Sequence, residues 1–211
     1  MKNLSFRLIK NGLPPFRPIL SAIGTPTYNL AKFLVPLLSE VTTNIYSVKD
    51  SFSFANEILS QNPEFYMASL DVDSLFTNIP LDETVKICVE KLYSKDTNKI
   101  NCIPKRDFLK LLELATKESF FLFNGSYYKQ LDGVAMGSPL GPTLANAFLC
   151  HHEVLWLKQC PKQFKPIFYR RYVDDIFVLF SSAKHLEPFK NYMNSRHETM
   201  NFTSDEESFN T

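Results

Sequence analysis

The sequence contains few cysteines, and their spacing is not that of a metal site. The four cysteines are not arranged as a pair separated by two residues. Neither a disulfide framework nor a zinc knuckle is therefore indicated, and a reducing intracellular setting fits. The one zinc candidate is Cys150-His151-His152 with Cys160, but neighbours along the predicted helix point to different faces, so we expect no zinc. The four positions are Cys88, Cys102, Cys150 and Cys160.

The sequence also lacks a signal peptide and any apolar run of 18 residues. We therefore expect no membrane contact and no secretion. The chain has 211 residues, of which 45% are hydrophobic and 14% aromatic. This composition supports a globular core in one sizeable domain or two small ones.

Acidic residues are absent from two tracts, 1–39 and 154–173, although the net charge of the whole chain is only +1. Both tracts carry lysine and arginine, whereas the stretch after His197 is acidic. Basic tracts suit the phosphate backbone of a nucleic acid, and a solvated protein face is the alternative. The basic residues are Lys2, Arg7, Lys10, Arg17, Lys32, Lys158, Lys162, Lys165, Arg170 and Arg171.

The hydrophobic periodicity predicts an α+β fold with helices packed on one face of an antiparallel sheet. Apolar spacing predicts a helix over 30–41, which Pro36 should kink or restart. A second helix is predicted over 53–61, with Phe54, Ile58 and Leu59 inward. A buried strand is predicted over 65–72, followed by a turn at 78–80. Asn124-Gly125 predicts a hairpin. Further helices are predicted from Asp82, from Pro104, over 143–158 with Leu144, Phe148 and Leu155 inward, and around 186–193, with a last strand over 200–203.

The stretch FYRRYVDDIFVLF, residues 168–180, predicts a tight hairpin with Asp174 and Asp175 at its tip. Adjacent carboxylates between apolar residues repel each other, and a divalent cation offsets this cost. An ordinary turn that uses aspartate is the alternative. Asp71 ends the predicted strand 65–72, so three carboxylates converge if the strands are neighbours. Asp73 would share the face of Asp71, and spacing alone does not separate them.

These motifs resemble those of reverse transcriptases. YVDD at 172–175 is similar to their motif C, SLDVDSLFTNIP at 69–80 to motif A, and GVAMGSPLGPTLAN at 133–146 to the glycine-rich motif B. The wording of FRPILSAIGTPTYNLAKFL at 16–34 is similar to Penelope-like retroelements, relatives of telomerase reverse transcriptase. The resemblance implies a right-hand polymerase palm with partial fingers and no thumb. Residues 1–68 would be partial fingers and 69–211 the palm, with a finger-derived insert around 94–131.

The resemblance implies RNA-directed DNA synthesis with two Mg²⁺ ions, for which Mn²⁺ is a possible substitute, by in-line nucleotidyl transfer to a primer 3′-hydroxyl. Its partners would be an RNA template, a DNA primer and dNTPs, and a nuclear location would suit a retroelement enzyme. The implied metal ligands are Asp71, Asp174, Asp175 and the carbonyl of Val72. The implied nucleotide contacts are Arg17, Lys10, Phe76, Met136, Gly137 and Ser138, and the implied primer or template contacts are Tyr172, Arg170, Arg171 and Pro139.

Phe76 would stack under the nucleotide sugar and exclude a 2′-hydroxyl, whereas an ordinary core phenylalanine is the alternative. Arg17 offers a planar fork for triphosphate oxygens. The family continues past motif C into a thumb and commonly an endonuclease, so this chain is expected to be a core fragment. Two hypotheses follow: an active polymerase core, or a non-catalytic palm remnant that binds nucleic acid or a partner protein.

Overall fold

A computed structural model describes residues 2–4, 22–94, 102–117, 120–123, 126–130 and 133–205. The chain divides into two compact units. The first comprises Met1–Thr42 and Phe76–Phe148, and the second comprises Thr43–Leu75 and Leu149–Thr211. Each unit has its own sheet, with strand order β1-β4-β3 in the first and β5-β6-β2-β7 in the second.

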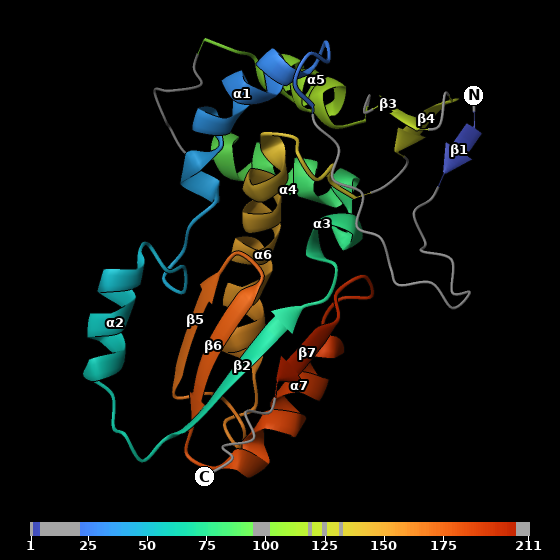
Figure 1. Ribbon diagram of the computed structural model, residues 1–211. Helices are drawn as coiled ribbons and strands as arrows, with labels where there is room; N and C mark the ends of the chain where they lie inside the picture. Colours follow the sequence, from blue (N-terminus) through green and yellow to red (C-terminus); the bar gives the residue numbers. More distant parts are fainter. Residues whose placement is uncertain are drawn as a thin grey trace. The chain divides into compact units, whose positions relative to one another are not determined.

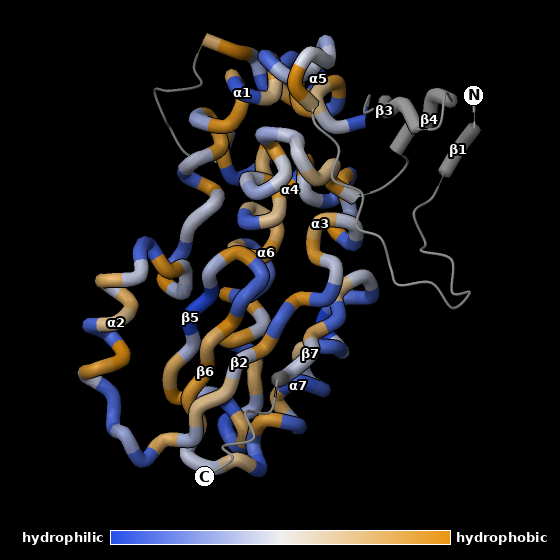
Figure 2. The backbone as a smooth tube through the Cα atoms, in the orientation of Figure 1, coloured by the Kyte–Doolittle hydropathy of each residue, from blue (hydrophilic) through white to orange (hydrophobic). Residues whose placement is uncertain are grey.

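The sheet of the second unit is antiparallel throughout (Figure 1). Its strands are β2 (Tyr66–Val72), β5 (Phe168–Tyr172), β6 (Asp175–Phe180) and β7 (Phe202–Asp205). The predicted strand over 65–72 is confirmed as β2. β6 lies between β5 and β2, and Figure 2 shows it coloured mainly as hydrophobic. This arrangement confirms the predicted α+β class.

Side chains alternate between the two faces of this sheet. On one face, Tyr169 donates a hydrogen bond to Glu153 of α6 (Leu140–Gln159), and Phe180 lies 5.6 Å from Phe189 of α7 (Leu186–Asn194) between ring centroids. The short helix η2 (Ala183–His185) precedes α7. On the other face, Phe177 makes an edge contact with Phe54 of α2 (Ser51–Leu59). Helix α2 therefore contacts the face opposite to α6 and α7, whereas the prediction placed helices on one face only.

Helix α2 begins at a capped N-terminus, because the side chain of Asp50 accepts a hydrogen bond of 2.8 Å from the amide of Ser53. The helix ends at Leu59, two residues before the predicted end. The inward orientation predicted for Leu59 is wrong, since this last residue is 82% exposed. Leu155 of α6 is also exposed, because a helix that is apolar on several sides has no single face that spacing can identify.

The first unit is built on helices α1 (Tyr28–Leu37), α4 (Leu81–Tyr93) and α5 (Lys105–Lys117). Its fully buried side chains include Leu34, Leu38, Phe108 and Leu112. Lys117 near the end of α5 forms an ion pair of 2.7 Å with Asp82 at the start of α4. Pro36 lies in the last turn of α1, which ends at Leu37, and the 3₁₀ helix η1 begins at Ser39 and ends at Val41, so the helical segment restarts after Pro36, one of the two predicted outcomes.

Two details of the first unit bear on the predicted motifs. β3 (Phe120–Phe123) and β4 (Ser126–Gln130) pair antiparallel, which confirms the predicted hairpin, and β4 also pairs in parallel with β1 (Lys2–Leu4). The loop residues Asn124-Gly125 lie outside the described residues. A short helix, α3 (Leu75–Asn78), precedes Pro80 where only a turn was predicted.

Among the described residues, no helix combines the length and the apolar character needed to span a membrane.

Candidate functional site

The turn between β5 and β6 contains two residues, Val173 and Asp174, because Tyr172 and Asp175 form the last cross-strand pair. Asp175 thus begins β6 and does not share the tip as predicted. Val173 has a φ of +58°, whereas Asp174 does not have a positive φ. This pattern is that of a type II′ turn, whose first central position normally holds glycine. A β-branched residue there costs about 1–3 kcal/mol, so the surrounding structure must hold the turn.

Three carboxylates meet at the turn end of this sheet. Asp71 of β2 lies directly opposite Asp175 of β6 in the antiparallel register. The amide of Val72 donates a hydrogen bond of 3.2 Å to the carbonyl of Asp174, which ties the turn to the neighbouring strand. Cβ atoms of directly opposed residues lie about 4.5–5.5 Å apart. The strand register and this backbone hydrogen bond therefore place Asp71, Asp174 and Asp175 at the same end of the sheet.

Asp73 takes a different position from Asp71. It lies beyond the end of β2 and is exposed, and its amide donates a hydrogen bond of 2.8 Å to the carbonyl of Asn201. Its carboxylate accepts a hydrogen bond of 2.9 Å from Ser74, which has a φ of +51°. Because Asp71 is in register with Asp175 and Asp73 is not, the geometry favours Asp71 as the third member of the cluster.

The donor type of these three aspartates suits a hard divalent cation. Like charges directly opposite each other on two strands are destabilising, so Asp71 and Asp175 need a compensating positive charge when both are ionised. Carboxylate and carbonyl oxygens are the ligands that Mg²⁺ and Mn²⁺ prefer. Asp71 and Asp174 are partly exposed and Asp175 is exposed, so solvent ions and substrates have access to them.

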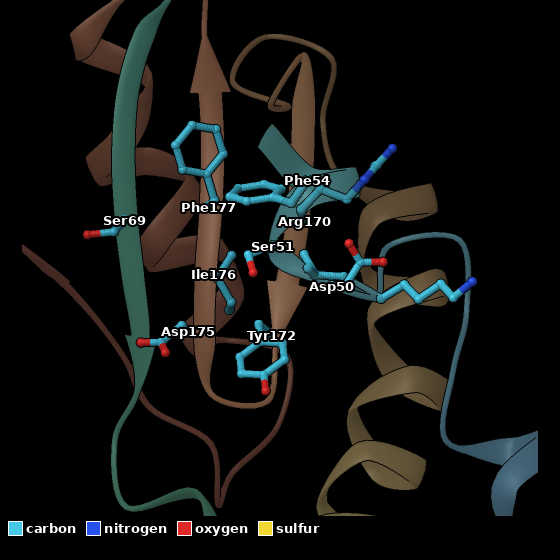
Figure 3. A pocket seen from close by; sticks show the side chains of 11 residues that line it. Asp50, Ser51, Phe54, Ser69, Arg170, Tyr172, Asp175, Ile176 and Phe177 are labelled. Carbon is cyan, nitrogen blue, oxygen red and sulfur yellow. The ribbon is translucent and has the colours of Figure 1, made fainter. Parts of the chain in front are cut away.

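A cavity of about 670 Å³, lined in part by Asp175, lies on the sheet face that also contacts α2. Figure 3 shows Asp175 and Tyr172 at the turn end of this cavity, with Phe177 farther along β6 and the ring of Phe54 from α2 beside it. Tyr172 is 60% exposed. This exposure leaves the ring of Tyr172 available for an extended ligand next to the carboxylates.

Arg170 lines the same cavity. Its Nε forms an ion pair with Glu57 of α2, and its Nη1 donates a hydrogen bond of 2.9 Å to the carbonyl of Tyr169. Its guanidinium also stacks 4.6 Å from the ring centroid of Phe168. Arg170 is thus partly exposed on the cavity face, where its predicted contact with a primer remains a prediction.

Arg171 points to the opposite face and is buried. Its side chain and that of Glu153 are each only 1% exposed and form an ion pair. The prediction that the Arg171 guanidinium reaches a primer backbone does not fit this burial, because alternate residues of a strand face opposite sides of the sheet. Sequence reasoning treated Arg170 and Arg171 alike, and only the register of the strand separates them.

Burial and the charge of Glu153 also determine the protonation states of Arg171 and Tyr169. Burial by itself would lower the pKa of Arg171, but the carboxylate of Glu153 more than offsets it, and the pKa lies above its usual value. Burial, together with the negative charge of Glu153, raises the pKa of Tyr169 well above its ordinary value. Arg171 therefore stays charged and Tyr169 neutral at physiological pH.

A second cavity, of about 710 Å³, lies in the first unit. It brings together Phe76 and the predicted motif B residues, and it also includes two residues that sequence reasoning missed, Ile23 and Tyr28. Gly137 in its wall has a φ of +104°, a conformation that other residues rarely adopt. The motif B residues in the wall are Met136, Gly137, Ser138 and Pro139.

Phe76 is held in this wall through its backbone. The amide of Val134 donates a hydrogen bond of 2.6 Å to the carbonyl of Phe76. A Cβ added to Gly133, whose φ is +71°, would lie 2.9 Å from the same carbonyl and 2.6 Å from that of Thr77. Glycine is thus required at this close approach, and it fixes motif B against the segment that carries Phe76.

Two predicted triphosphate ligands, Lys10 and Arg17, lie outside the described residues. Conversely, the structure identifies two residues that sequence reasoning did not select, Glu153 and Asn44, whose side chains form a hydrogen bond of 2.6 Å. Glu153 is the only acidic residue of α6. An isolated acid in an apolar helix is a usable signal, because a buried charge requires a partner.

Comparison with models of known protein families matches residues 9–207 to the family described as reverse transcriptase (RNA-dependent DNA polymerase). No curated protein matches the sequence.

Several solved structures have a similar fold. One is apo telomerase from Candida tropicalis truncated from its C-terminal domain, with a TM-score of 0.59 and 15% identity over 86% of this chain and 41% of that chain. Another is telomerase from Candida albicans with a TWJ fragment of telomeric RNA, with a TM-score of 0.60 and 12% identity over 88% of this chain and 36% of that chain. The chain thus spans well under half of either structure, and at this identity the likeness concerns the fold alone.

Proposed function

Because this chain belongs to the reverse transcriptase (RNA-dependent DNA polymerase) family, we propose that it is the catalytic core of an enzyme that copies RNA into DNA. The observation that carries the proposal is the cluster of Asp71, Asp174 and Asp175 at one end of the four-stranded sheet. The reaction is the attack of a primer 3′-hydroxyl on the α-phosphate of a dNTP, with release of pyrophosphate.

The carboxylates of the cluster and the carbonyl of Val72 would hold two Mg²⁺ ions, or Mn²⁺ in their place. Two such ions supply electrostatic stabilisation of the attacking and leaving oxygens in an in-line transfer. The protein's own contribution is position: paired strands hold Asp71 opposite Asp175, and the turn presents Asp174 beside them. Such preorganised placement is the main catalytic device in phosphoryl transfer.

The cavity beside Phe76 is proposed to bind the incoming nucleotide. Its wall combines an aromatic ring with glycine-containing backbone from Met136 to Pro139, which permits close approach to a flat base and sugar. The ring of Phe76 would then exclude a 2′-hydroxyl. Arg17 and, with it, Lys10 are proposed to bind the triphosphate through charge-assisted hydrogen bonds.

The surface around Tyr172 and Arg170 is proposed to meet the primer, and Pro139 the template. The basic tracts would contribute non-specific attraction to phosphates. Residues 1–68 are assigned to partial fingers and 69–211 to the palm with its finger-derived insert around 94–131. The wording of residues 16–34 supports a Penelope-like element as the source, and a nuclear location follows from that assignment.

The second candidate is a non-catalytic palm remnant. This chain spans 41% of one similar solved structure and 36% of another, so it shares with them a fold that extends over only part of each protein. A chain with this fold can remain folded after it has lost DNA synthesis. Such a remnant would bind nucleic acid or a partner protein.

Primer extension separates the two candidates. The protein is incubated with dNTPs, Mg²⁺ or Mn²⁺, and a DNA primer on matched RNA and DNA templates. We expect elongation on RNA that requires a divalent cation and stops after few additions. Absence of elongation with both cations, from protein shown by circular dichroism to be folded, would assign this chain to the remnant class.

Sugar selection by Phe76 is tested with a Phe76→Ala variant. We expect the preference for dNTP over rNTP, measured as the ratio of kcat/KM values, to fall by about 10–200-fold, the range typical of a lost steric contact. Phe76→Tyr is the matched control, because it keeps the ring and should keep the preference. A folded Phe76→Ala variant with the original preference would assign Phe76 to packing alone.

A further inference from the structure

A buried ion pair lies directly beneath the strained turn. The Nε of Arg171 donates to Oε2 of Glu153 at 2.8 Å, and its Nη2 donates to Oε1 at 3.0 Å. This two-point pairing fixes the guanidinium plane as well as its position. Both side chains are only 1% exposed.

The Nη1 group of the same guanidinium reaches the turn. The Nη1 of Arg171 donates a hydrogen bond of 2.8 Å to the carbonyl of Val173. Val173 is the residue with the left-handed φ of +58°, and its carbonyl belongs to the peptide that leads into Asp174. The arginine therefore holds the peptide that leads directly into Asp174, and the orientation of this peptide constrains the direction of the Asp174 side chain.

The carboxylate of Glu153 is itself held by two further donors. Asn44 donates to Oε1 at 2.6 Å, and the hydroxyl of Tyr169 donates to Oε2 at 3.3 Å. Asn44 also donates a hydrogen bond of 3.2 Å to the carbonyl of Cys150, one turn earlier in α6. Glu153 is thus a fixed anchor on α6 and not a mobile counter-ion.

The backbone of Arg171 is fixed as well. Its amide donates to the carbonyl of Tyr46 at 2.9 Å, and its carbonyl accepts from the amide of Val48 at 2.9 Å. The side-chain oxygen of Asn44 accepts from the amide of Tyr46 at 2.8 Å, so the segment that pairs with Arg171 is tied to the same network. Both ends of Arg171 are therefore immobilised before the chain enters the turn.

Stability alone does not account for this arrangement. A buried ion pair is often no more stabilising than apolar residues of similar volume, because both charges must be desolvated. The third donor of the guanidinium, directed at a strained carbonyl, is what an apolar replacement cannot supply. Partners that orient a metal-ligating residue in this way commonly affect metal affinity or activity by about 10–100-fold.

We propose that Arg171, anchored by Glu153, is a positioning residue that orients the Val173–Asp174 peptide, so that Asp174 and Asp175 present their carboxylates together with Asp71. The inference rests on the proposed function, because it treats these carboxylates as the metal-binding cluster. Neither Arg171 nor Glu153 touches the substrate in this scheme.

The test compares variants that separate the charge from the turn contact. Arg171→Met alone leaves Glu153 charged and unpaired, which is strongly destabilising. The double variant Arg171→Met with Glu153→Gln leaves no unpaired charge but loses the bond to Val173. The glutamine keeps one acceptor oxygen for Asn44, and its NH2 group can donate to the hydroxyl of Tyr169. Arg171→Lys keeps the charge without the planar fork. Cys150→Ala is the control, because it removes another neighbour of the guanidinium, 3.2 Å away, and spares the turn contact.

The first readout is Mn²⁺ affinity, which is measured by electron paramagnetic resonance in the absence of any substrate. We expect the folded double variant and Arg171→Lys to bind Mn²⁺ about 10–100-fold more weakly than the wild type, and Cys150→Ala to bind it normally. The second readout is primer extension, in which kcat should fall and the Mg²⁺ requirement rise while KM for the dNTP is unchanged.

The outcomes separate the two levels of the argument. Wild-type protein that binds Mn²⁺ but does not extend a primer contradicts the proposed function, and the variants still decide the positioning role through Mn²⁺ affinity. If the double variant is folded and binds Mn²⁺ with wild-type affinity, the inference is overturned. Wild-type protein that binds no Mn²⁺ also overturns it, since no metal-binding cluster would then exist for Arg171 to orient.

Discussion

An Asp174→Ala variant is expected to lose primer extension by about 10³-fold while it remains folded. Removal of one metal-holding carboxylate takes away several kcal/mol of transition-state stabilisation, and about 4 kcal/mol corresponds to a factor of about 10³. The fold should survive, because Asp174 is a turn residue whose bond to the amide of Val72 uses its backbone carbonyl. The measurement is single-turnover primer extension with Mg²⁺, combined with a thermal unfolding curve.

Asp73→Asn is the matched control for this experiment. Asp73 is a carboxylate only two residues from Asp71, but it lies outside the register that joins Asp71 to Asp175. We expect Asp73→Asn to extend primers at a rate close to that of the wild type and Asp71→Asn to be as defective as Asp174→Ala. If Asp73→Asn is the defective variant and Asp71→Asn extends primers normally, the metal ligand is Asp73 and not Asp71.

Substitution of Gly133 by alanine is expected to destabilise the protein by about 2–6 kcal/mol, the sum of backbone strain and overpacking. The added Cβ would lie 2.6 Å from the carbonyl oxygen and 2.8 Å from the Cα of Thr77. These are backbone atoms that no rotamer change moves. Because a whole domain is stable by only about 5–15 kcal/mol, urea unfolding should show a large shift or loss of the folded state.

Two other glycines separate the causes of this effect. Gly24 has a φ of +82° with nothing within 4 Å of an added Cβ, so Gly24→Ala tests backbone strain alone and should cost about 1–2 kcal/mol. Gly141 lies in α6 without a positive φ, and its added Cβ would lie 3.3 Å from the carbonyl of Ala135. Gly141→Ala therefore tests close packing without backbone strain. If Gly133→Ala is no less stable than Gly24→Ala, the close approach to Thr77 does not exist in solution.

Much of the fold was predictable because its signals are local. Three such signals are the apolar run at the start of 65–72, the asparagine-glycine pair between β3 and β4, and the apolar spacing of α4, α5 and α7. Each depends only on neighbours along the chain. Predictions failed where a local pattern was ambiguous. Leu59 is the final residue of its helix, and Leu155 lies on a helix that is apolar on several sides.

The candidate site was predictable in its acids but not in their support. A pair of aspartates between β-prone runs, together with Asp71 at the end of another strand, indicates a cluster from residue type and order alone. The role of Arg171 was not predictable, because its direction depends on the register of β5 and its partner Glu153 lies 18 residues earlier on α6. No local pattern connects two such residues.

The sequence by itself determined which chemical groups are available for the proposed function, since the acids, the glycine-rich segment and the aromatic residue after motif A are specified by residue type and order. Only the tertiary structure decided how these groups are held. It placed Asp71 and not Asp73 opposite Asp175, and it directed Arg170 to a cavity and Arg171 to a buried carboxylate. The reason is physical: strand register and burial arise from contacts between distant segments, and one residue of register exchanges the two faces of a strand.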